Sequence, residues 1–307
     1  MKKIPVGQII VSAYRLAFMS LEKVIALIWL PIIVLTVVDY FAKGAYLSAM
    51  AAALESGNNS QLGPIFAAQF GFAVFELIVR AVIAVAICRE ILAPLKRPLF
   101  LRFSLGGTEL RVMGAMVGLA ALMVLAVVLC MIAGTMLGGS LAVPASGMAP
   151  AQLAAGTAVM IGFVFSPLLI YIFVRLGALL VPAAVIEGGL GLERSWALLK
   201  GNVWRIIGVC VAVSVPLILI HAMLQGLAMG PDAGRQTFDP AGGFPALLRY
   251  MAVTFRQTAA HLPLLEGLDF VVAPFFYGLM FSAPAFAYKA LAESSIQAAI
   301  GSDGKLG

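Results

Sequence analysis

The second long apolar segment of the chain carries three polar residues on one expected helical face. Gln69, Glu76 and Arg80 are spaced i, i+7 and i+11, so on an α-helix they fall within about 40° of one another. Ionisable side chains at membrane depth are costly and normally face a bundle interior or a water-filled cavity. The stripe therefore indicates either a path for a substrate, ion or proton, or a structural Glu76–Arg80 pair at i,i+4.

A second set of charged residues lies between the fourth and fifth apolar segments. Arg175 stands at the end of the fourth segment, and Glu187 and Arg194 follow it. We expect Arg175 to pair with Glu187 across a short helix. Such a pair would act either as a clamp that fixes the helix or as part of a functional cluster at the membrane interface.

Two carboxylates, Glu266 and Asp269, stand at the start of the sixth apolar segment with i,i+3 spacing. His261 and Arg256 are close enough in sequence to join them on the same surface. A metal site would need a third ligand at fixed geometry, which the sequence does not specify. Solvated carboxylates favoured by the helix dipole are the simpler expectation. His221, inside the fifth segment, favours a helix–helix hydrogen bond over a proton relay.

These residues belong to a chain with the composition of an integral membrane protein. Of its 307 residues, 62% are hydrophobic and only 11% are charged, whereas soluble domains carry about 25% charged residues. Six runs approach the roughly 20 apolar residues that a membrane-spanning helix needs. These runs are 24–41, 65–87, 113–137, 153–174, 206–228 and 265–288. The sequence predicts an all-α integral membrane protein, a bundle of about six transmembrane helices with amphipathic interfacial helices.

Lysine and arginine are distributed unevenly among the connections between these runs. They are concentrated in the N-terminal segment, in the second-to-third and fourth-to-fifth connections, and after the sixth run. The positive-inside rule therefore predicts an even number of spans with both termini in the cytoplasm. Arg175, Glu187 and Arg194 then lie on the cytoplasmic side, and Glu266 and Asp269 on the outer face. The net charge of +6 follows from these loops and does not indicate nucleic-acid binding.

Three shorter segments have the pattern of helices at the membrane surface. Residues 153–186 are too long for one straight span, so we expect a break near Arg175–Gly177. A short helix over 176–186, either interfacial or re-entrant, should follow and be interrupted by Pro182. Residues 245–260 are amphipathic and suit a separate helix on the outer surface. Residues 45–56 would form a shorter version of it.

A weak internal repeat relates the two halves of the chain. When Tyr14 is aligned with Trp196, an amphipathic approach helix ending in Lys23 or Arg205 precedes an apolar run in both copies. The alignment favours either one helical membrane domain built from three-span repeats, 1–150 and 151–300, or two ordinary cytoplasmic approaches to a membrane.

The second copy of this approach helix carries a distinctive order of residues. It reads Pro182, Glu187, Ser195-Trp196, Lys200-Gly201 and Trp204-Arg205. This order resembles a segment of multi-spanning bacterial membrane proteins, among them the membrane domain that is joined in some proteins to a glycerophosphodiester phosphodiesterase. The resemblance implies a helical bundle in the bacterial cytoplasmic (inner) membrane. Phosphodiesterase activity is not implied, because the chain has no room for the soluble barrel and its loops lack a carboxylate/His cluster.

The sequence contains none of the common motifs for nucleotide binding or hydrolysis. It has no GxxxxGK[ST], GxGxxG, HExxH or GxSxG pattern. Cys88, Cys130 and Cys210 lie in or at the edge of apolar runs and form no CxxC pair. We therefore expect no catalytic residue, no cofactor and no metal.

Taken together, these patterns predict a non-enzymatic, multi-pass membrane protein that serves as an envelope or lipid-related scaffold or as an accessory subunit. Its expected partners are membrane lipids and either a second copy of itself or another membrane-protein subunit. One alternative is a transporter or channel that uses the polar stripe of the second span. Another is a membrane-embedded lipid-modifying enzyme with Arg175 and Glu187 at its centre.

Overall fold

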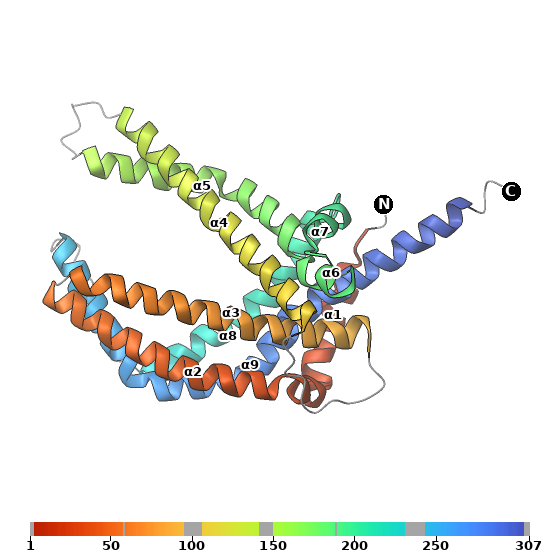
Figure 1. The fold of residues 1–307 in the computed structure, drawn as a ribbon, viewed down its shortest axis with the longest axis horizontal. Helices are drawn as coiled ribbons and strands as arrows, with labels where there is room; N and C mark the ends of the chain where they lie inside the picture. Colours follow the sequence, from red (N-terminus) through yellow and green to blue (C-terminus); the bar gives the residue numbers. More distant parts are fainter. Residues whose placement is uncertain are drawn as a thin grey trace. The chain divides into compact units, whose positions relative to one another are not determined.

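The computed structural model describes residues 3–57, 59–94, 106–140, 150–187, 189–230 and 243–303, and every regular element among them is a helix (Figure 1). Within these residues, six helices are long and apolar enough to cross a membrane. Each of the six predicted spans falls inside one of them, so the predicted all-α membrane architecture is confirmed.

The helices follow one another along the chain with short or undescribed connections. They are α1 (Val6–Tyr14), the π-helical turn η1 (Arg15–Met19), α2 (Leu21–Ser56), the 3₁₀ turn η2 (Asn59–Gln61), α3 (Leu62–Leu92), α4 (Gly107–Ser140), α5 (Pro150–Gly177), α6 (Leu180–Glu187), α7 (Leu192–Leu198), α8 (Val203–Met229) and α9 (Gly243–Asp303).

Two predicted surface helices are instead continuous with membrane-spanning helices. The alanine-rich residues 45–56 extend α2, which ends only at Gly57 with φ +66°. Residues 245–260 form the beginning of the 61-residue α9 and not a separate helix, although Pro263 lies within it. Both predictions of a break were wrong, because alanine-rich sequence favours helix and an unbroken helix satisfies its own backbone hydrogen bonds in apolar surroundings.

The predicted break after the fourth span is confirmed. Helix α5 ends at Gly177 and the short helix α6 begins at Leu180. Pro182 does not interrupt α6, contrary to the prediction, because it occupies the first turn, where a backbone N–H has no intrahelical acceptor.

The chain divides into two compact units, each assembled from separate stretches of sequence. One comprises Met1–Val6, Gly106–Gly208 and Ala287–Gly307, and the other comprises Gly7–Leu105 and Val209–Phe286. The limits of these units differ from the predicted halves 1–150 and 151–300, so the sequence duplication stays a prediction. We call them the hairpin unit and the bundle unit, after their main elements.

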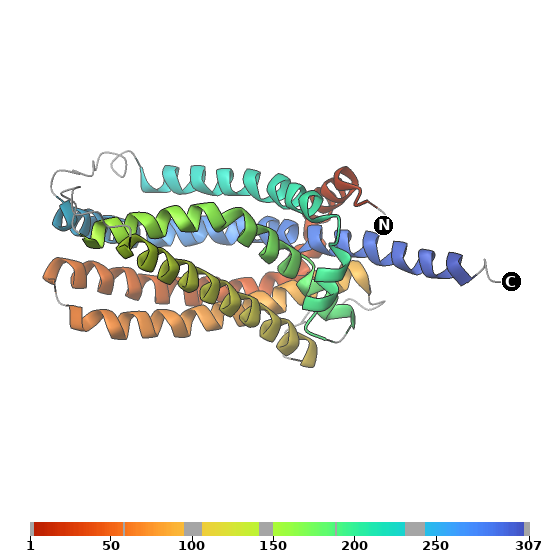
Figure 2. The same ribbon diagram turned by 90° about the horizontal axis from the view of Figure 1, so that it is seen from above.

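The hairpin unit is built around the antiparallel pair α4 and α5, which lie side by side in both views (Figure 2). The buried Ser195 on α7 joins the end of α5 to the turn before α6: its hydroxyl donates to the Arg175 carbonyl at 3.1 Å and accepts from the Leu179 N–H at 3.3 Å. The backbone N–H of Ile4 donates to the Asn202 side chain at 3.0 Å. These bonds fix short segments that are too small to fold alone.

The bundle unit contains α2, α3, most of α8 and the first part of α9. Helix α2 packs against α3, and Gly44 of α2 lies close to Leu262 of α9. The Cys88 thiol of α3 lies 3.9 Å from the Phe281 carbonyl of α9. Close approach also brings Val24 of α2 against Gly278 of α9, where a Cβ would lie 3.4 Å from Val24 Cγ1. Residues of α8 line one cavity together with residues of these three helices, so the four helices surround a common interior.

Candidate functional site

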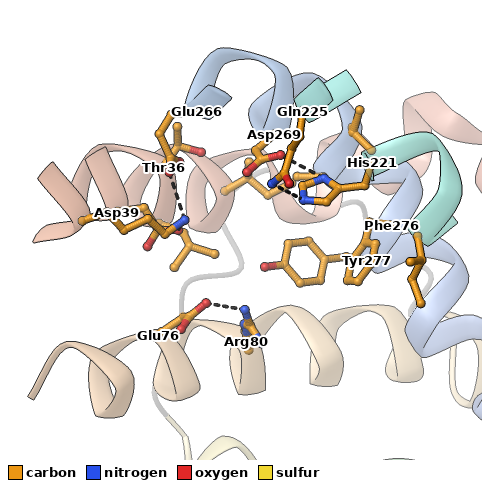
Figure 3. A pocket seen from close by; sticks show the side chains of 16 residues that line it. Thr36, Asp39, Glu76, Arg80, His221, Gln225, Glu266, Asp269, Phe276 and Tyr277 are labelled. Carbon is orange, nitrogen blue, oxygen red and sulfur yellow. Dashed lines mark hydrogen bonds and ion pairs between the residues drawn. The ribbon is translucent and has the colours of Figure 1, made fainter. Parts of the chain in front are cut away.

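The interior of the bundle unit contains a cavity of about 460 Å³ lined by ionisable side chains from four helices (Figure 3). Each helix contributes residues at helical spacing along one face, such as Asp39 and Lys43 on α2 and Glu76 and Arg80 on α3. The ionisable residues of the lining are Asp39, Lys43, Glu76, Arg80, His221, Glu266, Asp269 and Tyr277. Glu76 lies near the middle of the 31-residue α3, so the cavity extends to the middle of a helix long and apolar enough to cross a membrane.

Lys43 bridges two carboxylates from different helices. Its ammonium nitrogen lies 3.1 Å from Asp39 Oδ2 on its own helix and 2.9 Å from Glu266 Oε1 on α9. The contact with Glu266 is a charge-assisted hydrogen bond, and the contact with Asp39 is an ion pair. One lysine therefore serves two acidic residues, which leaves this corner of the cavity with an excess of negative charge.

Asp39 is a deeply buried acid in this corner of the cavity. Only 7% of the residue is exposed, and its Oδ1 atom has no hydrogen-bond partner among the described residues. A buried carboxylate oxygen without a donor is unfavourable and is uncommon in folded proteins. Asp39 is thus able to accept a further hydrogen bond from a group inside the cavity.

Glu76 and Arg80 form the predicted i,i+4 ion pair on α3, and both line the cavity. Gln69, the third residue of the predicted stripe, is half-buried and is not among the lining residues. Of the three residues in the predicted stripe, only Glu76 and Arg80 line the cavity. Figure 3 shows the hydroxyl of Tyr277 projecting into the space beside this pair.

His221 and its partners form the third polar group of the lining. Its Nδ1 atom lies 3.2 Å from Asp269 Oδ1 on α9, and its Nε2 atom lies 2.7 Å from the Gln225 amide one turn further along α8. The predicted helix–helix contact of His221 is therefore present, and it places both ring nitrogens within hydrogen-bonding distance of a partner.

The charges of the lining do not balance. Asp39, Glu76, Glu266 and Asp269 are acidic, whereas Lys43 and Arg80 are the permanent cations and His221 is charged only when protonated. The formal charge is therefore negative with His221 in either state. The aromatic rings of Phe276 and Tyr277 and the aliphatic side chains of Ile32 and Leu35 complete the walls.

The predicted outer-face pair, Glu266 and Asp269, belongs to this cavity and not to a separate surface cluster. Glu266 is only 5% exposed, so it is not the solvated carboxylate that the sequence suggested. His261 instead contacts the Gln257 carbonyl at 2.9 Å, and Arg256 pairs with Glu55 at 2.6 Å. The physical reason is the continuity of α9, which carries Glu266 and Asp269 into the bundle interior.

The predicted cytoplasmic clamp forms with different pairings. Glu187 pairs with Arg194 at 2.7 Å and accepts a hydrogen bond from the Tyr288 hydroxyl at 2.7 Å. Arg175 does not pair with Glu187, contrary to the prediction. Its guanidinium lies 3.8 Å from the centre of the Trp196 ring, and its Nε donates to the Trp196 carbonyl at 3.2 Å. The π face of Trp196 and a backbone acceptor together hold this arginine.

Sequence reasoning missed Asp39, Lys43 and Gln225 as members of the site. Asp39 and Lys43 have the same acid-to-base i,i+4 spacing as Glu76 and Arg80, which was the available signal. It was overlooked because the first span was predicted to end at residue 41, which assigned Lys43 to an outer loop.

The described part of the chain contains no group of three or more His, Cys, Asp or Glu side chains placed to hold a metal ion. Comparisons of the chain with known protein families, with curated proteins and with solved structures find no match. The cavity therefore carries the functional argument.

Proposed function

We propose that this multi-pass membrane protein transports a small polar solute and that the charged cavity of the bundle unit is its binding site. One observation carries the proposal: seven acidic or basic side chains from four membrane-spanning helices line a single cavity of about 460 Å³. Charged residues inside spans are rare and usually mark ion or substrate paths. A volume of this size falls within the range of about 300–1,000 Å³ that is usual for small-molecule sites.

The membrane and the orientation of the protein are part of the same proposal. The resemblance of residues 175–207 supports a bacterial cytoplasmic membrane, and the lysine and arginine distribution supports cytoplasmic termini. Solute would then cross between the cytoplasm and the outer face through the bundle unit. The protein acts without catalysis in this proposal, and membrane lipids are its immediate surroundings.

Pairing among the charged groups favours a second candidate, the envelope or lipid-related scaffold or accessory subunit. Glu76 with Arg80, Asp269 with His221, and Glu266 with Lys43 each satisfy one another within the bundle. Such pairs also serve to hold helices together. The lipid-enzyme alternative lacks comparable support, because Arg175 and Glu187 are held by separate partners.

Water access to the cavity distinguishes transport from scaffolding. Glu76→Cys is made in a chain whose three cysteines are replaced by alanine or serine, and is treated with a membrane-impermeant thiol reagent from each side of oriented vesicles. We expect labelling from at least one side, because a transported polar solute needs an aqueous path to its site. Protection of position 76 from both sides, with Gln61→Cys labelled as a control, would refute transport.

A lipid-facing control on the same helix makes this test specific. Val74 is exposed on α3 two residues before Glu76 and is not among the cavity-lining residues. Val74→Cys is therefore expected to be protected by lipid from a water-soluble reagent. Labelling of position 76 and not of position 74 would mean that water enters through the cavity.

A further inference from the structure

We propose that the cavity recognises a small organic cation through a protonated amine, with Asp39 and Glu266 as the ammonium-binding pair and Lys43 as a tethered occupant of that position. This inference rests on the transport function proposed above and adds the chemical class of the solute. It further states which residue of the chain competes with the solute.

The side chain of Lys43 is a bound alkylammonium within the protein itself. Its nitrogen lies between Asp39 Oδ2 at 3.1 Å and Glu266 Oε1 at 2.9 Å. An ammonium group has three donors and no acceptor, so it matches two converging carboxylates. The spacing of these two acids is thus suited to one ammonium nitrogen, and a primary amine in solution carries the same group.

The free oxygen of Asp39 gives this pair capacity for a further donor. Within the described part of the chain, Asp39 Oδ1 has no hydrogen-bond partner although the residue is only 7% exposed. The atom belongs to a side chain that lines the cavity. An N–H donor on a solute would satisfy it, whereas an anionic solute would place a second acceptor against it.

The remaining lining also favours an organic cation over other solutes. Four carboxylates stand against two permanent cations, so a positive solute reduces the charge imbalance and a negative one increases it. Phe276 and Tyr277 supply aromatic faces that attract cations. The described residues do not gather three ligands for a metal ion, which favours an amine that needs only hydrogen-bond acceptors.

Exchange between Lys43 and the solute is sterically simple. The Lys43 side chain is 37% exposed, and its four-carbon stem is flexible. The solute ammonium takes the position between Asp39 and Glu266, and the lysine head moves into the open part of the cavity. In the solute-free site, Lys43 keeps the two acids from being left unpaired. The solute has to displace Lys43, so the lysine lowers the affinity for the solute.

The test measures binding of defined amines to the purified full chain in nanodiscs by isothermal titration calorimetry. The probes are n-butylammonium, putrescine, tetramethylammonium and succinate. Lys43→Met is expected to raise the affinity for n-butylammonium by roughly tenfold, because it removes the internal competitor. Asp39→Asn and Glu266→Gln are each expected to lower it by roughly tenfold to a hundredfold, the usual effect of losing a charged hydrogen bond.

An ion pair outside the cavity supplies the matched control. Glu55 on α2 and Arg256 on α9 join the same two helices as Asp39, Lys43 and Glu266. Their side chains are 40% and 68% exposed, and neither is among the lining residues. Glu55→Gln and Arg256→Met are expected to change amine affinity by less than about twofold.

Three results would each overturn the proposal. They are tighter binding of succinate than of n-butylammonium, tighter binding of tetramethylammonium, which has no N–H to donate, and reduced amine affinity in a Lys43→Met protein that elutes as a folded species. If Lys43→Met does not fold, Lys43→Gln and the wild-type probe series decide. Labelling of Glu76→Cys without amine binding would remove the solute class and leave transport standing, whereas protection of position 76 would remove transport itself.

Discussion

Two groups of ionisable residues in this chain differ in the ratio of acids to their partners. In the bundle unit, Asp39 and Glu266 share the ammonium of Lys43, and one Asp39 oxygen has no partner among the residues that the structure describes. In the hairpin unit, Glu187 alone receives both Arg194 and the Tyr288 hydroxyl. The first arrangement leaves a buried acceptor atom unpartnered inside a cavity, whereas both partners of Glu187 converge on its Oε1 atom and the Glu187 side chain is more than a third exposed.

If the cavity is the proposed binding site, this difference in partners distinguishes it from a structural contact. Buried ion pairs contribute little net stability, but removing one member of a pair is costly. A cluster of buried acids with more acceptor atoms than donors does not add to stability. Such a cluster is therefore expected where it serves a function such as binding. The hairpin unit is expected to lose stability on substitution, and the cavity is expected to lose function. The following predictions test that contrast, beginning with the largest effect.

The largest loss of stability is expected for Gly191→Ala in the hairpin unit. Gly191 precedes α7 with φ +75°, and a Cβ there would lie 2.5 Å from the Leu180 carbonyl oxygen. The left-handed conformation and this close approach together should lower the free energy of unfolding by about 2–4 kcal/mol. Unfolding by titration with sodium dodecyl sulfate in mixed micelles measures the change.

Gly189→Ala is the control for this substitution. Gly189 is two residues away, has no positive φ, and would have no atom within 4 Å of an added Cβ. It should change the unfolding free energy by less than about 0.5 kcal/mol. Equal effects of the two substitutions would contradict the tight fit of α6 against Gly191.

The outline of the fold follows from local sequence, whereas the cavity does not. Length and hydropathy identify each span, and the Arg175–Gly177 break was predicted because 153–186 is too long for one helix. The combination of Asp39, Lys43, Glu266 and Asp269 requires knowing that α2 and α9 extend past their predicted ends and pack together. Such contacts join residues more than 200 positions apart, which a helical pattern within one segment does not encode.

The pairing of Arg175 shows the same limit on a smaller scale. Its charge and position at a helix end predicted a carboxylate partner, but the guanidinium lies over Trp196. An aromatic ring and a backbone carbonyl attract an arginine as a carboxylate does. The choice among them depends on where the Ser195 bonds place α7, and that placement is a tertiary feature.

The second largest effect on stability is expected for Ser195→Ala. Ser195 is fully buried and bonds both the Arg175 carbonyl and the Leu179 N–H. Removing the hydroxyl leaves buried backbone groups without their partner and should lower the unfolding free energy by about 1–3 kcal/mol. The same detergent titration measures this change.

Ser166→Ala provides the comparison for the serine substitution. The Ser166 hydroxyl donates an exposed hydrogen bond to the Phe163 carbonyl of its own helix, so its loss should cost less than about 0.5 kcal/mol. If Ser166→Ala were as harmful as Ser195→Ala, the special role of Ser195 in joining α5, α6 and α7 would be wrong.

The smallest effects, and the most direct test of the contrast, come from neutralising one acid in each region. Glu187→Gln removes the charge that Arg194 pairs with, and because both side chains are more than a third exposed, the unfolding free energy should fall by only about 0.5–1 kcal/mol. Asp39→Asn removes a surplus negative charge while Glu266 still holds Lys43. It should leave stability unchanged or raise it by up to about 1 kcal/mol.

Both variants are titrated with the same detergent, side by side. A loss of stability is predicted for Glu187→Gln only. A loss for Asp39→Asn as large as that for Glu187→Gln would mean that the cavity acids serve to hold α2 and α9 together and not to bind a solute.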